Sequence, residues 1–199
     1  MAMPDRVSTP ALEKPGMPAT SGWAWAAFVT AVVTVAGSLA LTLVDNKQAC
    51  PLCFYQRTFA LGLVAVLGQG LLSVAVPSSR LAVLALPLAI GGLGVAAFHV
   101  SLETRNILEC PTGLFDVLTA PKQSLAMFAI LTIVLAAGVW NGMKARQVSP
   151  LASVLALALG GGLVWASISA NPKPPPSPTK PYDTPPSVCR PPYHGPESK

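Results

Sequence analysis

The sequence predicts an all-α integral membrane protein, an antiparallel bundle of transmembrane helices, from three observations. The 199 residues are 52% hydrophobic and only 11% charged, and their mean hydropathy is +0.55, which is too apolar for an ordinary soluble domain. The apolar residues fall in runs close to ~20 residues, the length that crosses the bilayer as a helix. Short polar segments separate these runs. The net charge of +5 comes without a nucleic-acid motif, so we expect no nucleic-acid partner.

The first part of the chain predicts a tail and two spans. Residues 1–22 are polar and contain four prolines, a composition typical of a disordered tail, which we place in the cytoplasm. Residues 23–44 are uncharged and begin with two tryptophans suited to the membrane interface. A short polar loop then leads to a second span at residues 54–76, whose polar side chains should face the bundle or the head groups.

The second part predicts three further spans, at residues 81–100, 123–140 and 151–170. The turn before the third span is tight, so that span returns antiparallel, and its glycines allow neighbouring helices to approach closely. In the loop that follows, residues 114–118 are apolar enough to lie along the membrane surface. The fourth span is somewhat short for a bilayer. Residues 171–199 contain eleven prolines and predict a mobile extracytoplasmic arm of polyproline type.

Two cysteines at the start of the second span suggest redox chemistry. Cys50 and Cys53 are two residues apart and can close a small disulfide, while Pro51 suits the first turn of a helix. A helix N-terminus favours the thiolate, which is the species that attacks disulfides. Arg57 follows Cys53 by four residues, so it should lie over the same helix face, favour a Cys53 thiolate and hold an oxygen-bearing acceptor. The alternative is that Arg57 only anchors the helix at the membrane interface.

A metal site is the other use for this cysteine pair. A structural zinc needs four ligands, and the other candidates are Cys110, Cys189, His99 and His194. None of these is paired at the usual ligand spacing. We therefore predict no metal site.

The segment Cys50-Pro51-Leu52-Cys53-Phe54-Tyr55-Gln56-Arg57 resembles the signature of the disulfide bond formation protein B family (DsbB, with relatives called BdbC). The resemblance implies a four-helix core, here with an added fifth span, and a quinone-dependent oxidase. Such an enzyme reoxidises a soluble DsbA-like thioredoxin-fold protein and passes the electrons to ubiquinone or menaquinone. It implies that Cys53 is the thiol nearest the quinone and that Cys50 exchanges with a second cysteine pair. It also implies that His99 lies by the quinone, although His99 could be an interface residue instead. From its register with Cys53, we expect Arg57 to contact the quinone as well.

The chain departs from the family pattern in its second cysteine pair. Family members resembling DsbB carry both of these cysteines in the loop between spans three and four, whereas here Cys110 lies in that loop and Cys189 follows the fifth span. We expect Cys110 and Cys189 to form the exchange disulfide. The alternatives are a disulfide that only tethers the tail, or an unpaired Cys189.

Topology and function follow from these expectations. With a cytoplasmic N-terminus, five crossings place the four cysteines and the C-terminus outside a bacterial inner membrane, and the distribution of basic residues agrees modestly. The expected function is a membrane thiol oxidase. The alternatives are a reductase working in the opposite direction, or a metal-binding or scaffold protein stapled by its cysteines.

Overall fold

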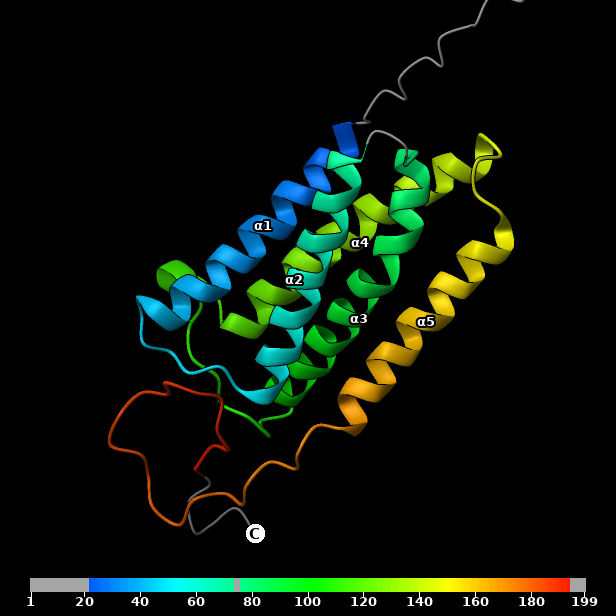
Figure 1. Cartoon of the computed structure of the whole chain (residues 1–199). Coiled ribbons are helices and arrows are strands. Elements are labelled where there is room, and N and C mark those ends of the chain that lie inside the picture. Colours follow the sequence, from blue (N-terminus) through cyan, green and yellow to red (C-terminus); the bar gives the residue numbers. More distant parts are fainter. Residues whose placement is uncertain (1–21, 74–75, 194–199) are drawn as a thin grey trace, which may run out of the picture.

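Five long helices make up the computed structural model, which describes residues 22–73 and 76–193 (Figure 1). They are α1 (Gly22–Leu43), α2 (Pro51–Leu72), α3 (Ser78–Thr104), α4 (Ala120–Lys144) and α5 (Pro150–Ser169), with a 3-10 turn, η1 (Leu114–Asp116), before α4. All five are long and apolar enough to cross a membrane. The predicted all-α membrane bundle is therefore confirmed. The predicted N-terminal tail, except for Gly22, lies outside the described residues.

Helix α3 is the centre of the bundle. It packs against α2, α4 and α5, while α1 packs against α2 and α4. The first four helices thus form a four-helix bundle, and α5 lies against the outer side of α3 (Figure 1). Successive helices run in opposite directions, so the chain returns to the same end of the bundle after α1, α3 and α5.

The core is built from large apolar side chains packed against glycines. Leu63, Leu67 and Phe128 are fully buried. A Cβ atom on Gly92 of α3 would collide with the Phe128 ring, so this glycine lets the ring of α4 pack directly on the α3 backbone. A Cβ atom on Gly94 would likewise collide with Val164, so this glycine lets α5 pack directly on the α3 backbone. The close approach predicted at these glycines is present.

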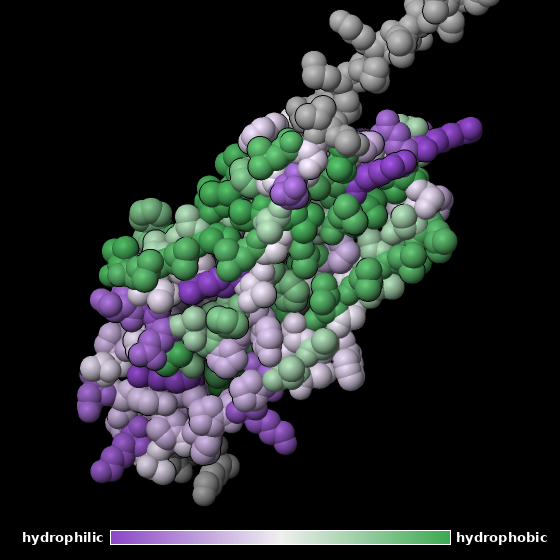
Figure 2. All heavy atoms as spheres, viewed as in Figure 1, coloured by the Kyte–Doolittle hydropathy of each residue, from purple (hydrophilic) through white to green (hydrophobic). Residues whose placement is uncertain are grey.

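The outer surface suits a membrane. On the face shown in Figure 2, hydrophobic residues cover the sides of the bundle and hydrophilic residues gather at its two ends. Large apolar side chains stay exposed between those ends, among them Leu84, Ile133 and Trp165. Exposed apolar side chains on every helix are the pattern that lipid contact favours.

Several predicted boundaries shift. Helix α2 begins at Pro51 rather than at residue 54, because proline fits the first turn of a helix. Helix α4 begins early for the same reason, because Pro121 lies in its first turn. It runs from Ala120 to Lys144, so the fourth span is not short. The surface segment predicted at residues 114–118 is only the turn η1, with Phe115 exposed.

The C-terminal arm is extended but not free. Residues 171–193 cross the end of the bundle without a helix (Figure 1). The Gln48 amide donates to the Ser187 carbonyl (2.8 Å), and Glu109 and Arg190 exchange two backbone hydrogen bonds (2.7 and 3.0 Å). These bonds hold the arm against the loops that follow α1 and α3. Composition does not reveal these backbone partners, and the mobility of the arm stays a prediction.

Candidate functional site

The structure brings all four cysteines together at one end of the bundle. Cys50 and Cys53 lie at the start of α2, Cys110 in the loop after α3, and Cys189 in the C-terminal arm. Figure 1 shows these three segments meeting at the same end. Cys110 and Cys189 are joined by a disulfide, whereas Cys50 and Cys53 are two free thiols.

Helix geometry positions the two free thiols. Cys50 is the N-cap of α2 with extended backbone, and its sulfur accepts a hydrogen bond from the Cys53 amide (3.3 Å). The two Sγ atoms are 2.9 Å apart. Cys50 is buried and Cys53 is partly exposed. The N-cap role of Cys50 thus satisfies one of the free amides of the helix N-terminus and presents both sulfurs to each other.

The electrostatics of this pair favour a thiolate at Cys50. The hydrogen bond with the Cys53 thiol, assisted by His99 and the Cys53 amide, lowers the pKa of Cys50 to about 4, although burial acts in the opposite direction. In the structure Cys50 receives the helix N-terminal amide and faces the imidazole. The thiolate expected at Cys53, next to Arg57, stays a prediction.

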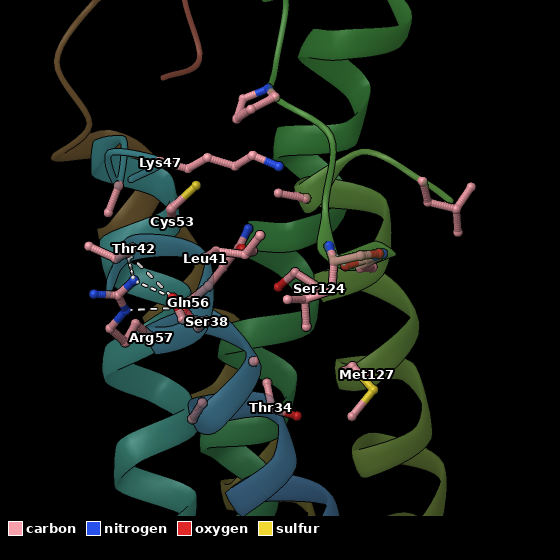
Figure 3. Close-up of a pocket in the computed structure, with 18 of the residues that line it drawn as sticks. Thr34, Ser38, Leu41, Thr42, Lys47, Cys53, Gln56, Arg57, Ser124 and Met127 are labelled. Carbon is pink, nitrogen blue, oxygen red and sulfur yellow. Dashed lines mark hydrogen bonds between the residues drawn. The ribbon is translucent and has the colours of Figure 1, made fainter. Parts of the chain in front are cut away.

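The Arg57 side chain binds the neighbouring helix. Its guanidinium donates to Ser38 Oγ (3.0 Å), to the Ser38 carbonyl (2.8 Å) and to Thr42 Oγ1 (2.7 Å), all on α1 (Figure 3). These bonds tie α2 to α1 near their shared end. Arg57 also lines the cavity described next.

A largely apolar cavity of about 360 Å³ lies beside Cys53 (Figure 3). Its walls come from α1, α2, α4 and the loop after α3, and they include Cys53, Gln56, Arg57 and Met127. Cavities of ~300 Å³ and above with a few polar groups are typical of small-molecule sites. The cavity could therefore hold an apolar ligand against the Cys53 sulfur.

Two residues of this region were not assigned a site role from the sequence. Gln56 is only 5% exposed, and its Nε2 has no hydrogen-bond partner. Lys47 Nζ donates to the Thr112 carbonyl (2.6 Å) and joins the loop after α1 to the loop after α3 beside the cavity. The position of Gln56 in the cysteine motif could have indicated a role for Gln56 in the site. Nothing local in the sequence indicates that Lys47 binds Thr112.

His99 lies among sulfur atoms and not on the cavity wall. It is fully buried on α3, and its Nε2 is 3.3 Å from Cys189 Sγ, 3.4 Å from Cys110 Sγ and 3.8 Å from Cys50 Sγ. Its Nδ1 has no partner. A contact between His99 and a bound quinone stays a prediction.

The described residues contain one group suited to a metal ion, made of Cys50, Cys53, His99 and Cys189, whose ligand atoms lie within 4.8 Å of one another. Spacing along the chain does not indicate it, because the fold assembles it from three separate segments. The Cys189 sulfur is held in the disulfide, so the full set needs that bond to open. His194 lies outside the described residues.

Comparison with known proteins gives one family. Residues 20–123 match the family model described as Disulfide bond formation protein DsbB. Disulfide bond formation protein B of Burkholderia ambifaria is 35% identical over 96 residues, which are 47% of this chain and 54% of that protein. A probable disulfide formation protein of Chlamydia muridarum is 35% identical over 101 residues, 45% of this chain and 73% of that protein. No solved structure matches.

The extent of these matches matters for the site. The chain spans about half the length of the Burkholderia relative. The region that matches the family model includes Cys50, Cys53, Arg57, His99 and Cys110. It ends before α5 and Cys189, so the features specific to this chain have to be argued from its own structure.

Proposed function

Because this membrane protein belongs to the disulfide bond formation protein B family, we propose that it oxidises the thiols of a soluble thioredoxin-fold protein and passes the electrons to quinone. One observation carries the proposal: Cys53 contacts Cys50 on one side and lines an apolar cavity on the other. A dithiol in that position can receive electrons by disulfide exchange and release them to a ligand in the cavity.

Electrons enter at the Cys110–Cys189 disulfide. Cys110 is only 8% exposed, whereas Cys189 is more accessible. The partner's thiolate therefore attacks Cys189 Sγ, forms a mixed disulfide there and releases the Cys110 sulfur. The partner's second thiol then resolves the mixed disulfide. The partner leaves oxidised, and Cys110 and Cys189 become a dithiol.

The second pair receives the electrons next. The Cys189 sulfur lies within 4.8 Å of the Cys50 and Cys53 sulfurs, so exchange needs only a small movement. After this step Cys110 and Cys189 are joined by a disulfide again, and Cys50 and Cys53 are two thiols.

The cavity residues fit a quinone. When bound, a quinone supplies an acceptor for two electrons and two protons. The buried, unpaired Nε2 of Gln56 is a donor that a carbonyl oxygen would satisfy, and Arg57 adds a fixed positive charge to the wall. The apolar side chains from α1 and α4 exclude water and suit a ring that arrives through lipid. Ubiquinone and menaquinone share this chemistry.

The orientation of the protein in the membrane is part of the proposal. A cytoplasmic N-terminus and five crossings place the cysteine end of the bundle outside a bacterial inner membrane. The support is that α1, α3 and α5 all end on the side where the cysteines gather (Figure 1).

A turnover assay tests the proposed function. Purified protein, a reduced thioredoxin-fold protein and ubiquinone or menaquinone are mixed, and quinone reduction is followed. Cys53→Ser is expected to abolish it, whereas Thr58→Ala, on the exposed side of the same helix, should keep the wild-type rate. Wild-type turnover in Cys53→Ser would remove this thiol from the mechanism.

Two rival functions are distinguishable. A reductase would use the same thiols in reverse, and the reduction potential of Cys50 and Cys53 against that of the partner decides the direction. The metal-capable group of Cys50, Cys53, His99 and Cys189 favours a metal-binding rival. Stoichiometric zinc in protein purified without reductant would support that rival, because metal ligation and disulfide formation compete for the same sulfurs.

A further inference from the structure

His99 contacts both cysteine pairs through a single nitrogen atom. Its Nε2 is 3.3 Å from Cys189 Sγ and 3.4 Å from Cys110 Sγ, the two sulfurs of the disulfide. The same atom is 3.8 Å from Cys50 Sγ. A side chain that touches the reacting sulfurs of both pairs lies where exchange between them takes place.

The surroundings of His99 do not suit a purely structural role. The side chain has no exposed surface, and its Nδ1 finds no hydrogen-bond partner. Burying an unpaired polar atom is unfavourable, and a histidine placed only for packing could be replaced by an apolar residue. The neighbours of Nε2 are sulfurs, which gain and lose protons during exchange.

From this geometry we propose that His99 carries a proton between the two cysteine pairs, as general base and then general acid in the internal disulfide exchange. The proposal rests on the function proposed above. It gives His99 a place at the exchange step and not at the acceptor, since His99 is not among the residues that line the cavity.

The first half of the exchange begins with the Cys110 and Cys189 dithiol and the Cys50–Cys53 disulfide. The Cys189 thiol gives its proton to His99 Nε2, and the resulting thiolate attacks Cys50 Sγ. The Cys50–Cys189 bond forms, the Cys50–Cys53 bond breaks, and Cys53 leaves as a thiolate. Deprotonating the attacking thiol matters because the thiolate is the nucleophile.

In the second half, Cys110 attacks Cys189 Sγ. The Cys110–Cys189 bond forms and the Cys50–Cys189 bond breaks. Before this attack, Nε2 gives the proton that it holds to the Cys53 thiolate, whose sulfur lies within 4.8 Å, and takes the Cys110 proton. Cys110 therefore attacks as a thiolate, and Cys50 leaves as a thiolate. Two electrons have moved to the Cys50 and Cys53 pair. Of the two protons, one is shared between these sulfurs, which lie 2.9 Å apart, and the other stays on His99.

The test separates exchange from the quinone step. In the exchange arm, oxidised protein receives electrons from the reduced thioredoxin-fold partner, and single-turnover reduction of the Cys50–Cys53 disulfide is followed by acid quenching and thiol labelling. In the bypass arm, Cys110→Ser and Cys189→Ser are introduced together and dithiothreitol reduces Cys50–Cys53 directly, so that quinone reduction is measured without exchange.

His99→Gln is expected to slow the exchange arm by about 100-fold or more, the usual size of a general acid–base contribution, and to leave the bypass arm within about twofold of the parent under the same reasoning. Ser101→Ala, a change on the same helix that removes only a local bond to Phe98, is the matched control. Unchanged exchange in His99→Gln would overturn the role of His99. A wild-type protein that moves no electrons between its pairs would instead overturn the proposed function.

A second measurement needs no variant. If His99→Gln is inactive in both the exchange assay and the bypass assay because it does not fold, the exchange assay is repeated with the wild-type protein in deuterated water. A transferred proton predicts slower exchange there than in ordinary water at equivalent pH. Equal rates would overturn the proposal.

Discussion

Gln56→Met should make the quinone-free protein more stable while it weakens quinone binding. The amide is 5% exposed and its Nε2 is unpaired, and an unsatisfied buried polar group costs about 1–3 kcal/mol. Methionine has a similar length and removes that cost. We therefore expect the free energy of unfolding without quinone to rise by about 1 kcal/mol, which corresponds to roughly 2–4 °C in Tm for a chain of this size.

The same change should cost affinity when quinone is present. A typical hydrogen bond contributes about 0.5–1.5 kcal/mol net, so the KM for quinone is expected to rise about two- to tenfold. The assays are thermal unfolding in detergent, with and without quinone, and quinone titration of turnover. Gln69→Met, an exposed glutamine on the same helix, is the matched control and should change neither quantity. A lower Tm in the quinone-free Gln56→Met variant, or an unchanged KM, would refute the reasoning.

Four further predictions concern the elements around the site. Arg57→Lys should lower the stability of the protein by about 1–3 kcal/mol, because the single nitrogen of lysine cannot reproduce the planar fork through which two guanidinium nitrogens bond Ser38 and Thr42 on α1. Thermal unfolding checks this, and an unchanged Tm would show that these bonds are dispensable. The pKa of Cys50 falls from 9.0 to about 4 on folding, so its contribution to the stability of the reduced protein should be fully present above pH 9.0 and be lost as the pH falls toward 4. Cys53→Ala should raise the pKa of Cys50, because it removes the hydrogen bond with the Cys53 thiol that lowers this pKa most. Thiolate absorbance during pH titration measures the pKa, and an unmoved midpoint would contradict this cause. Gly92→Ala should destabilise the bundle by about 1–3 kcal/mol through overpacking on Phe128, whereas Gly161→Ala, which meets open space, should be neutral in the same melts.

The sequence predicted the parts of the fold that depend on local composition. Runs of apolar residues located all five helices, because the bilayer requires a minimum length of apolar chain whatever its neighbours. The helix ends were less well placed at α2 and α4, where Pro51 and Pro121 begin the helices earlier than hydropathy suggests. Cys53 consequently lies inside the first turn and Cys50 caps it.

The site was only partly predictable, because its contacts join segments that are distant in the chain. Spacing placed Arg57 near Cys53 but could not show that the guanidinium binds α1. Nothing local indicates that His99 meets sulfurs from α2, from a loop and from the arm. Proline content predicted an extended arm, and only the backbone bonds of Ser187 and Arg190 show that the arm is held against the bundle.

The most direct test of the electron path counts electrons in the absence of oxygen. Fully reduced protein, with four thiols, is freed of reductant and mixed with excess quinone, and the quinol formed per protein is measured. Two dithiols connected through Cys53 predict two quinols per protein for the wild type. Cys110→Ser together with Cys189→Ser should yield one, and Cys53→Ser none. A wild-type yield of zero, or full yield without Cys53, would contradict the path from the outer cysteine pair through Cys53 to quinone.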